Sequence, residues 1–390
     1  MKNERAALAL TVAITALIAG GVLYYVLTTG GSIQSTTPTT TTGVAEPGTT
    51  VKVLDFANRT VEVKTPVKRI VAIGPGALRL IVYLNATELL VGVEEVEKTW
   101  SPVGRDYAMA YGDVLKALPV IGKGGPGNPP DPEAIASVRP DLIVMSAYYT
   151  TLKDPDELSR ATGAAVIVVD YSPVTSTNLS MFYRALRLLG EVLGRSDRAE
   201  ALVNYTESLL KDLRSRTTGL NTTSIRVYVG AVSYRGGQPF TGTQVPYPPL
   251  SWLGMASIAD TMATTRGFLN VDFDSILMAQ PDVVFVDEGN LNIVVQDFSK
   301  DPGKYCALRA FTGGRVYGLL PFNYYHSNIA TALANSYYIG KVLFPERFTD
   351  VDPASKADEI YSVFLGKQVY SVFLQKYPGY INLSSIFQCK

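Results

Sequence analysis

A sixteen-residue pattern occurs twice in the chain without a gap, at residues 131–146 and 272–287. Each copy has an acid at its third position, Glu133 or Asp274, and a later Pro-Asp pair that leads into an apolar run. Because proline lacks the N–H that a helix interior needs, each copy predicts a short helix followed by a buried strand. Chance recurrence of this joint in α/β proteins is the alternative. If the repeat is real, the chain forms two similar α/β lobes with the functional site between them.

The length and composition of the chain agree with two lobes and exclude several classes of protein. At 390 residues the chain is too long for one ordinary hydrophobic core. Lys plus Arg and Asp plus Glu number 35 each, which argues against a nucleic-acid-binding surface. The single histidine excludes a multi-histidine site for a bare zinc or manganese ion. Cys306 and Cys389 cannot build a disulfide framework; they either pair with each other outside the cell or remain two thiols.

The N-terminal part of the chain predicts export across a membrane. Residues 1–5 carry a net positive charge and form the expected cytoplasmic end, whereas residues 6–27 carry no charge. These 22 residues, at about 1.5 Å each, would span roughly 33 Å as a helix. We therefore expect an uncleaved single-pass anchor that holds the body on the extracellular face of the cell membrane. A cleaved signal peptide is the alternative, but no clear cleavage site precedes Tyr24 and Tyr25.

A Thr-rich segment, residues 28–50, follows the predicted anchor. Its composition cannot bury enough apolar area to fold, so we expect an extended stalk. The part of the chain beyond it carries Asn-x-Ser/Thr sequons, which agree with an exported glycoprotein. These sequons begin at Asn58, Asn85, Asn178, Asn204, Asn221 and Asn382.

The body of the chain divides into an N-terminal α/β lobe over residues 51–174, a linker helix over 175–194 and a C-terminal α/β lobe over 195–390. Apolar residues recur at helical spacing in the predicted linker, and buried strands open both lobes. The expected fold class is therefore α/β, with two similar lobes, central mostly parallel sheets and a cleft between the lobes.

The order of these features resembles the helix-linked binding proteins of ABC importers for iron–siderophore complexes, haem and cobalamin. The family's opening strand is matched by Arg69–Gly74, its acid-bearing helix by Glu133 and its Pro-Asp-Leu-Ile strand by Pro140–Ile143. The resemblance covers roughly residues 66 to 345 and includes the repeated unit. The loop Asn323–Asn328 and the helix after it most resemble archaeal members that handle iron complexes. Gly/Pro-rich insertions at 98–130 and 234–249 depart from the family pattern, so the ligand is not carried over from it.

In open α/β sheets, ligands gather beyond the carboxyl ends of the strands. We therefore expect the ligand-binding residues in the loops that follow the strands. Arginines there suit anionic groups of a metal chelate, and tyrosines suit the wall of a planar ligand. The candidates are Gly76, Arg79, Trp100, Tyr148, Tyr149, Tyr234, Arg235, Tyr324, Tyr325 and His326.

His326 is the candidate with the most specific chemistry. It either contacts the ligand or caps the helix that begins near Ile329. Direct ligation of iron is expected of it only if the ligand is haem. No intrinsic cofactor is expected, and the bound ligand is expected to be a metal chelate.

The third-position acids of the repeat have a separate predicted role. The resemblance implies that Glu133 and Asp274 dock onto the permease, where charge pairs supply orientation and association rate. The alternative is an ordinary first-turn acid that stabilises a helix N-terminus. Asp274 stands where the family usually has Glu, which shortens its reach.

The sequence thus predicts an extracytoplasmic substrate-binding component of an ABC importer, partnered by a permease and its ATPase. Its expected ligand is an iron(III) complex, such as a siderophore or haem, or cobalamin. A molybdate or tungstate receptor of the same fold is the alternative, with backbone N–H groups as donors. We expect no enzyme, because the chain has no Gly-x-Ser-x-Gly elbow and no phosphate-binding loop. An extracellular hydrolase or a structural surface protein remains a weaker alternative.

Overall fold

The computed structural model describes residues 48–171 and 177–389. The predicted anchor at 6–27 and the predicted stalk up to residue 47 lie outside the described residues. No helix among those described is both long and apolar enough to cross a membrane. The described residues belong to one compact unit, which is described by itself below.

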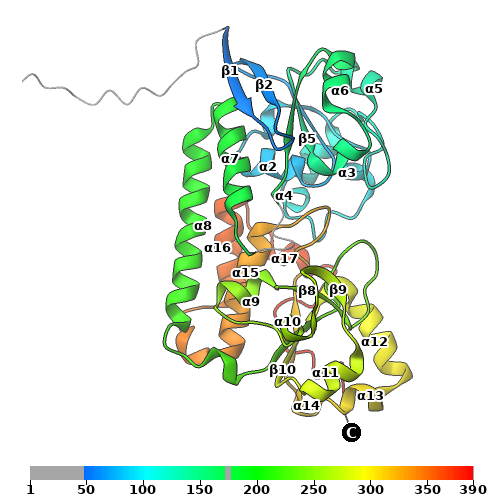
Figure 1. Ribbon diagram of the computed structural model, residues 1–390, viewed down its shortest axis with the longest axis vertical. Helices are drawn as coiled ribbons and strands as arrows, with labels where there is room; N and C mark the ends of the chain where they lie inside the picture. The colour runs from blue at the N-terminus through cyan, green and yellow to red at the C-terminus, as the bar shows by residue number, and fades with distance from the viewer. Residues whose placement is uncertain (1–47, 172–176, 390) are drawn as a thin grey trace, which may run out of the picture. The chain divides into compact units, whose positions relative to one another are not determined.

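The first lobe is built on a parallel sheet with the strand order β4-β3-β5-β6. Figure 1 labels its inner strand β5. The central strand β5 is buried along its whole length, as expected for an apolar run covered on both faces. The strands are β3 (Ile70–Ile73), β4 (Leu90–Gly92), β5 (Leu142–Ser146) and β6 (Ala165–Val169). The helices are α2 (Ala77–Tyr83), α3 (Val96–Thr99), α4 (Asp106–Ala117), α5 (Pro132–Ser137) and α6 (Pro155–Thr162), with 3₁₀ turns at Thr87–Leu89 and Ala147–Thr151.

An antiparallel hairpin of β1 (Thr49–Leu54) and β2 (Thr60–Thr65) precedes this sheet. Its buried Asp55 accepts hydrogen bonds from the Val168 N–H at 3.1 Å and from the Arg59 guanidinium. Arg59 also donates to the Val166 carbonyl at 2.8 Å. One carboxylate and one arginine therefore attach the hairpin to β6.

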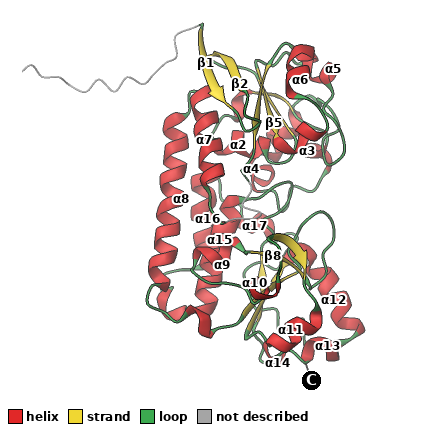
Figure 2. Ribbon diagram, in the orientation of Figure 1, coloured by secondary structure: helices red, strands yellow, loops and turns green. Residues whose placement is uncertain are grey.

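The second lobe has a smaller parallel sheet with the order β11-β10-β7 and an antiparallel pair, β8 and β9. Its strands are β7 (Val227–Gly230), β8 (Gly242–Val245), β9 (Gly267–Asn270), β10 (Val283–Asp287) and β11 (Val316–Leu319). Helices surround both sheets, as the colouring by secondary structure shows (Figure 2). They are α9 (Pro248–Trp252), α10 (Ala259–Met262), α11 (Phe273–Ala279), α12 (Leu291–Lys300), α13 (Pro302–Cys306), α14 (Arg309–Thr312), α15 (Ile329–Leu343), α16 (Pro353–Leu365) and α17 (Tyr370–Phe373), with 3₁₀ turns at Thr222–Ser224, Glu288–Asn290 and Pro345–Arg347. The predicted two-lobed α/β fold is confirmed.

Two helices connect the lobes along the chain. The helix predicted over 175–194 is observed as α7 (Ser180–Val192), and the 22-residue α8 (Ser196–Thr217) runs beside it before the chain enters the second sheet (Figure 1). The C-terminal part of the chain adds a further link. The Tyr111 hydroxyl on α4 donates to the Leu365 carbonyl at the end of α16 at 2.9 Å, and Lys367 donates to the Ala110 carbonyl at 2.6 Å.

The two copies of the repeated pattern have the same local structure. Asp131 and Asp272 are the N-caps of α5 and α11, and each side chain accepts a backbone N–H of the first helical turn. The isoleucines Ile135 and Ile276 are fully buried. The repeat is therefore real at the level of helix caps and packing.

The Pro-Asp joint is also the same in both copies. Arg139 and Gln280, which precede the prolines, have left-handed φ angles of 46° and 45°. The aspartates that follow the prolines accept hydrogen bonds from the start of the neighbouring strand: Asp141 from Lys68 and Arg69 N–H, and Asp282 from Arg226 N–H. Each aspartate thus joins the repeat to the strand that opens its lobe.

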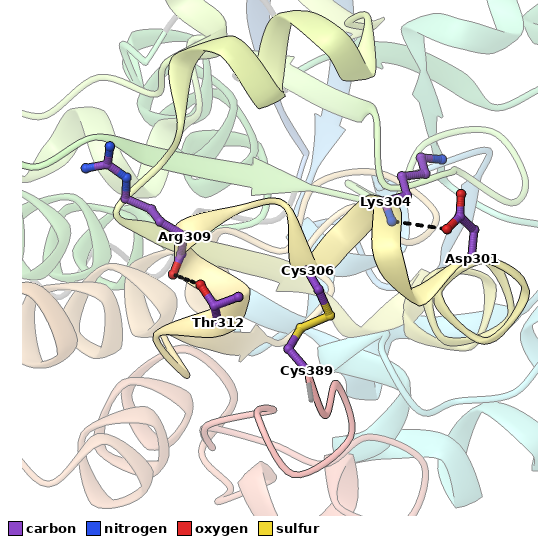
Figure 3. Close-up of a disulfide and its surroundings, with 6 residues drawn as sticks. All are labelled: Asp301, Lys304, Cys306, Arg309, Thr312 and Cys389. Atoms are coloured by element: carbon purple, nitrogen blue, oxygen red, sulfur yellow. Dashed lines mark hydrogen bonds between the residues drawn. A yellow bond between two sulfur atoms is a disulfide. The ribbon is translucent and has the colours of Figure 1, made fainter.

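The two cysteines form a disulfide between α13 and the end of the chain, Cys306–Cys389 (Figure 3). Ahead of Cys389, the chain lies along the edge strand β11. The Leu383 N–H donates to the Val316 carbonyl at 2.7 Å, and the Gly318 N–H donates to the Ile381 carbonyl at 3.0 Å. The disulfide therefore fastens a segment that covers an otherwise open sheet edge.

Candidate ligand site between the lobes

The loop that follows β11, residues 323–328, reaches from the second lobe into the first. Tyr325 is buried, and the His326 side chain is 14% exposed. Both residues have left-handed backbones, with φ of 51° and 81°. Two consecutive non-glycine residues in this region are unusual and require support from their surroundings.

Arg79 of α2 supplies part of that support. Its side chain is fully buried and forms an ion pair with Asp106 at 2.7 Å. Its remaining N–H groups donate to Tyr171 Oη at 2.8 Å, to Asn328 Oδ1 at 2.7 Å and to backbone carbonyls of the 323–328 loop. Tyr83 also donates to Asp106, so the buried carboxylate that neutralises Arg79 has a second hydrogen-bond donor.

Glu94 forms a second connection between the lobes. Its buried carboxyl accepts hydrogen bonds from Gly74 N–H at 2.9 Å, from Tyr149 Oη at 2.9 Å and from Tyr325 Oη at 3.0 Å. Burial raises the pKa of Glu94 to about 7, and the three donors limit that rise. Gly125 N–H donates to Tyr325 Oη at 3.1 Å, so the phenol is fixed on both sides.

His326 lies against the first lobe. Its ring centre is 4.3 Å from that of Tyr171, and its Nε2 is 3.4 Å from Asp170 Oδ1. Its Nδ1 is buried and has no hydrogen-bond partner among the described residues. Burial lowers the pKa of His326, and the neighbouring carboxylate of Asp170 opposes this effect. The imidazole is therefore neutral at neutral pH.

Gly76 allows this close approach of the lobes. A Cβ atom at Gly76 would lie 2.7 Å from Tyr171 Oη and 2.8 Å from His326 Cγ, and its φ of 84° is left-handed. Any side chain here would push His326 or Tyr171 away.

Aromatic rings surround the same junction. Trp100 stacks on Tyr324 with ring centres 6.3 Å apart and meets Tyr325 edge-on at 5.3 Å. The buried Arg105, paired with Glu97, lies 5.8 Å from the centre of the Tyr324 ring. The structure thus brings together seven of the predicted residues: Gly76, Arg79, Trp100, Tyr149, Tyr324, Tyr325 and His326.

The other three predicted ligand residues lie at strand ends without a contact to His326. Tyr148 is 38% exposed beside Tyr149. Tyr234 stacks on Phe268 with ring centres 3.9 Å apart. Arg235 is exposed above Tyr234 and forms no ion pair with any residue that the structure describes. Tyr148 lies on the first lobe, whereas Tyr234 and Arg235 lie on the second.

The corresponding strand end in the second lobe carries two buried acids. Asp287 accepts from Ser233 N–H and Gly289 N–H, and burial raises its pKa to about 6. Glu288 accepts from Gly379 N–H at 3.0 Å, while its Oε1 has no partner among the described residues. Burial raises the pKa of Glu288 to about 8.

The predicted docking acids lie apart from this junction. Glu133 on α5 and Asp274 on α11 are both exposed, each in the first turn of its helix. Within the described ranges, no group of three or more His, Cys, Asp or Glu residues could hold a metal ion.

Sequence reasoning missed Glu94, Asp106 and Asn328. Glu94 directly follows the strand around Leu90, so the strand-end rule that selected Tyr148 could have found it. Asn328 lies in the loop after β11, which the same rule selects, but its role and that of Asp106 depend on Arg79, which lies far away in the sequence.

Comparison with known proteins supports the fold and the family. A family model described as periplasmic binding protein matches residues 70–321. The molybdate-binding protein MolA of Haemophilus influenzae is 23% identical over 333 residues, which cover 80% of this chain and 90% of MolA.

Solved structures of similar fold include MolA bound to molybdate, with a TM-score of 0.63 at 18% identity, covering 82% of this chain and 98% of that chain. A TroA-like periplasmic binding protein, FepB, from Veillonella parvula has a TM-score of 0.62 at 18% identity, covering 82% and 97%. An ABC transporter solute-binding protein from Sulfurospirillum deleyianum has a TM-score of 0.61 at 19% identity, covering 84% and 98%. These relatives are bacterial, so the resemblance to archaeal members stays a prediction. The family model covers well over half of the chain, and the chain therefore belongs to the periplasmic binding protein family of ABC transporters.

Proposed function

We propose that the protein captures a small-molecule ligand at the lobe junction on the outer side of a membrane and delivers it to an ABC permease driven by its ATPase. The family membership supports the transport role. The position of the 323–328 loop supports the site, because residues from strand ends of both lobes meet there. The mechanism is binding and release, without covalent chemistry.

The proposed ligand is a metal complex with an organic shell, of the iron(III)–siderophore, haem or cobalamin class. The observation that carries this choice is the state of His326. Its Nε2 faces the carboxylate of Asp170, which favours the proton on Nε2 and leaves a lone pair on the partnerless Nδ1. A histidine that binds a metal typically donates its other N–H to a carboxylate in this way.

The wider surface fits the organic part of such a ligand. Tyr148 offers a partly exposed aromatic ring on the first lobe, and Arg235, which lies over Tyr234 on the second lobe, offers a guanidinium with no ion pair in the described part of the chain. A guanidinium binds carboxylate or similar anionic groups through paired N–H donors. Because Nδ1 of His326 is covered in this arrangement, ligand entry requires a local movement that uncovers this atom.

The second candidate is a molybdate or tungstate ion. The relationship to the molybdate-binding protein MolA favours it. An oxyanion accepts hydrogen bonds, so His326 would have to carry its proton on Nδ1 or be doubly protonated. The Asp170 carboxylate near the site disfavours binding of an anion there.

A pair of His326 variants separates the two candidates. We expect wild-type protein to bind a panel of ferric catecholate and hydroxamate complexes, haem or cobalamin more tightly than molybdate or tungstate, as measured by calorimetry and by absorbance. His326→Gln keeps a side chain that can donate to an oxyanion but replaces the imidazole that can bind a metal. We therefore expect both His326→Gln and His326→Ala to weaken binding of the metal complex.

The same variants also give an outcome that contradicts the metal-complex proposal. Tight molybdate or tungstate binding by wild type, retained in His326→Gln and lost in His326→Ala, would establish the oxyanion instead. Metal analysis of the protein as isolated provides an independent check, since it reports iron or cobalt in the first case and molybdenum or tungsten in the second.

The membrane attachment and surface modification belong to the same proposal. Residues 6–27 anchor the protein, and glycans occupy exposed sequons; all six sequon asparagines are exposed. Membrane fractionation of native cells and mass spectrometry of tryptic glycopeptides test these two points. Recovery of a shortened, unglycosylated chain in the soluble fraction would contradict both.

A further inference from the structure

We propose that Arg79 is a positioning residue, which holds His326 in its ligand-binding orientation from the opposite lobe without touching the ligand itself. This inference rests on the proposed role of His326 as a ligand contact. It reassigns Arg79, which the sequence suggested as a direct contact.

The first argument is that Arg79 is already fully occupied. Its guanidinium is inaccessible to solvent, and its Nε and both terminal nitrogens have protein partners. Asp106 neutralises its charge, and Tyr83 holds Asp106 in place. Nothing of Arg79 remains to meet an incoming ligand.

The second argument is where those partners lie. Arg79 belongs to α2 of the first lobe, yet four of its acceptors belong to the 323–328 loop of the second. They are the carbonyls of Tyr324 at 3.2 Å, Tyr325 at 3.4 Å and Ser327 at 3.4 Å, together with Asn328 Oδ1 at 2.7 Å. These acceptors flank His326 on both sides in the chain.

The third argument is the backbone conformation that the hydrogen bonds from Arg79 stabilise. Tyr325 and His326 have consecutive left-handed backbones, which side chains with a Cβ atom rarely adopt. A planar guanidinium can hold several carbonyl groups in one fixed geometry, whereas the ammonium group of lysine is a point charge. Arginine is therefore required at this position, and its positive charge alone does not suffice.

Arg79 also links the backbone of the loop to the ring of His326. It donates to Tyr171 Oη, and the Tyr171 ring contacts the imidazole with ring centres 4.3 Å apart. One arginine thus fixes both the segment that carries His326 and the aromatic surface on which it rests.

The test uses the fact that the chain contains one histidine. In protein labelled with ¹³C and ¹⁵N histidine, every imidazole signal comes from His326, with or without ligand. We compare wild type with Arg79→Lys. We expect the imidazole signals to move and the His326 pKa to rise towards that of a solvated histidine, because the loop leaves its buried position. We also expect affinity for the metal complex bound by wild type to fall roughly tenfold or more.

Arg59→Lys is the matched control. Arg59 also pairs with a carboxylate and donates to a backbone carbonyl in the first lobe, but it contacts no residue of the 323–328 loop. We expect it to leave the His326 signals and ligand affinity unchanged. Should Arg79→Lys fail to fold, as judged by thermal unfolding, Asn328→Ser carries the same expectation, because it removes the nearest loop acceptor of Arg79.

Unchanged imidazole signals and unchanged affinity in folded Arg79→Lys would overturn the positioning role, as would equal changes in the Arg59→Lys control. A shift of the imidazole without loss of affinity would also overturn it. If wild type binds none of the metal complexes, the proposed ligand class fails, while the ligand-free imidazole signals still decide whether Arg79 orients His326.

Discussion

The two copies of the repeat begin alike and end differently. In both lobes an aspartate caps a short helix, a buried isoleucine anchors it, and the Pro-Asp joint holds the neighbouring strand. At the end of the strand, however, the copies differ. The first lobe ends β5 with Ser146 and continues to Tyr148 and Tyr149, whereas the second ends β10 with Asp287 and continues with Glu288. The beginning of each unit serves the fold, whereas its end carries side chains particular to that lobe.

Each strand end nevertheless lies beside a buried carboxyl group. Glu94, next to Tyr149, has three hydrogen-bond donors, and its pKa rises only to about 7. Glu288 has one donor and an oxygen without a partner in the described ranges, and its pKa rises to about 8. The comparison shows that donors to the carboxylate partly offset the cost of burying its charge.

The largest effect on stability is expected at the isoleucines that both copies of the repeat share. Ile135→Ala and Ile276→Ala should each lower the free energy of unfolding by about 2–5 kcal/mol, because each removes fully buried methyl groups. Chemical denaturation measures the loss. Met278→Ala, on the same helix as Ile276 but 86% exposed, should cost almost nothing. A large loss at only one isoleucine would mean that the copies are not equivalent.

The next test concerns the different strand ends. The folded pKa of Glu288 lies above its ordinary value of 4.5, so its stabilising contribution is complete below that value and is lost as pH rises towards 8. The titratable groups around Glu288 are Asp287 and four tyrosines: Tyr338, Tyr370, Tyr377 and Tyr380. Between about pH 5 and 8, wild type should lose on the order of 3 kcal/mol that Glu288→Gln does not lose.

Thermal unfolding across this pH range measures the difference. Glu346→Gln, at an exposed position in Pro345–Arg347, is the control and should keep the wild-type slope. Glu94→Gln should remove a smaller part of the pH dependence of stability than Glu288→Gln removes. The reverse order would contradict the link between donors and pKa.

A smaller effect is expected at the Pro-Asp joints. Asp141→Asn and Asp282→Asn should each cost about 1–2 kcal/mol of stability, because an amide accepts the strand N–H groups less strongly than a carboxylate. The loss should be greater at Asp282, which also forms ion pairs with Arg226 and Arg309. Urea unfolding of both variants measures it, and a greater loss at Asp141 would count against this account.

The smallest effect on the protein itself is expected at the proposed docking acids. Glu133→Lys and Asp274→Lys change exposed side chains and should alter stability by less than about 0.5 kcal/mol. Ligand affinity should also be unchanged, whereas ligand uptake by the intact transporter should fall, most strongly in the double variant. Glu346→Lys is the control. Lost ligand affinity in the double variant would show that these acids do not act in docking.

Much of the fold could be predicted because its signals are local. Capping aspartates, prolines and apolar runs lie within a few residues of one another, so they identified both repeat units and the α/β class. The strand-end rule also selected most of the residues that meet at the lobe junction. It could not show which of them face a ligand. Arg79 and Tyr148 both follow a predicted strand, yet Arg79 is fully buried and Tyr148 is 38% exposed.

The sequence by itself therefore determined two repeated α/β lobes and the loops in which a ligand site should lie. Only the tertiary structure decided that the two cysteines pair, that Glu94 joins both lobes, and that Arg79 is used by the protein itself. The physical reason is distance along the chain. Arg79 and Asn328 are joined by one hydrogen bond, but no local pattern in the sequence records that contact.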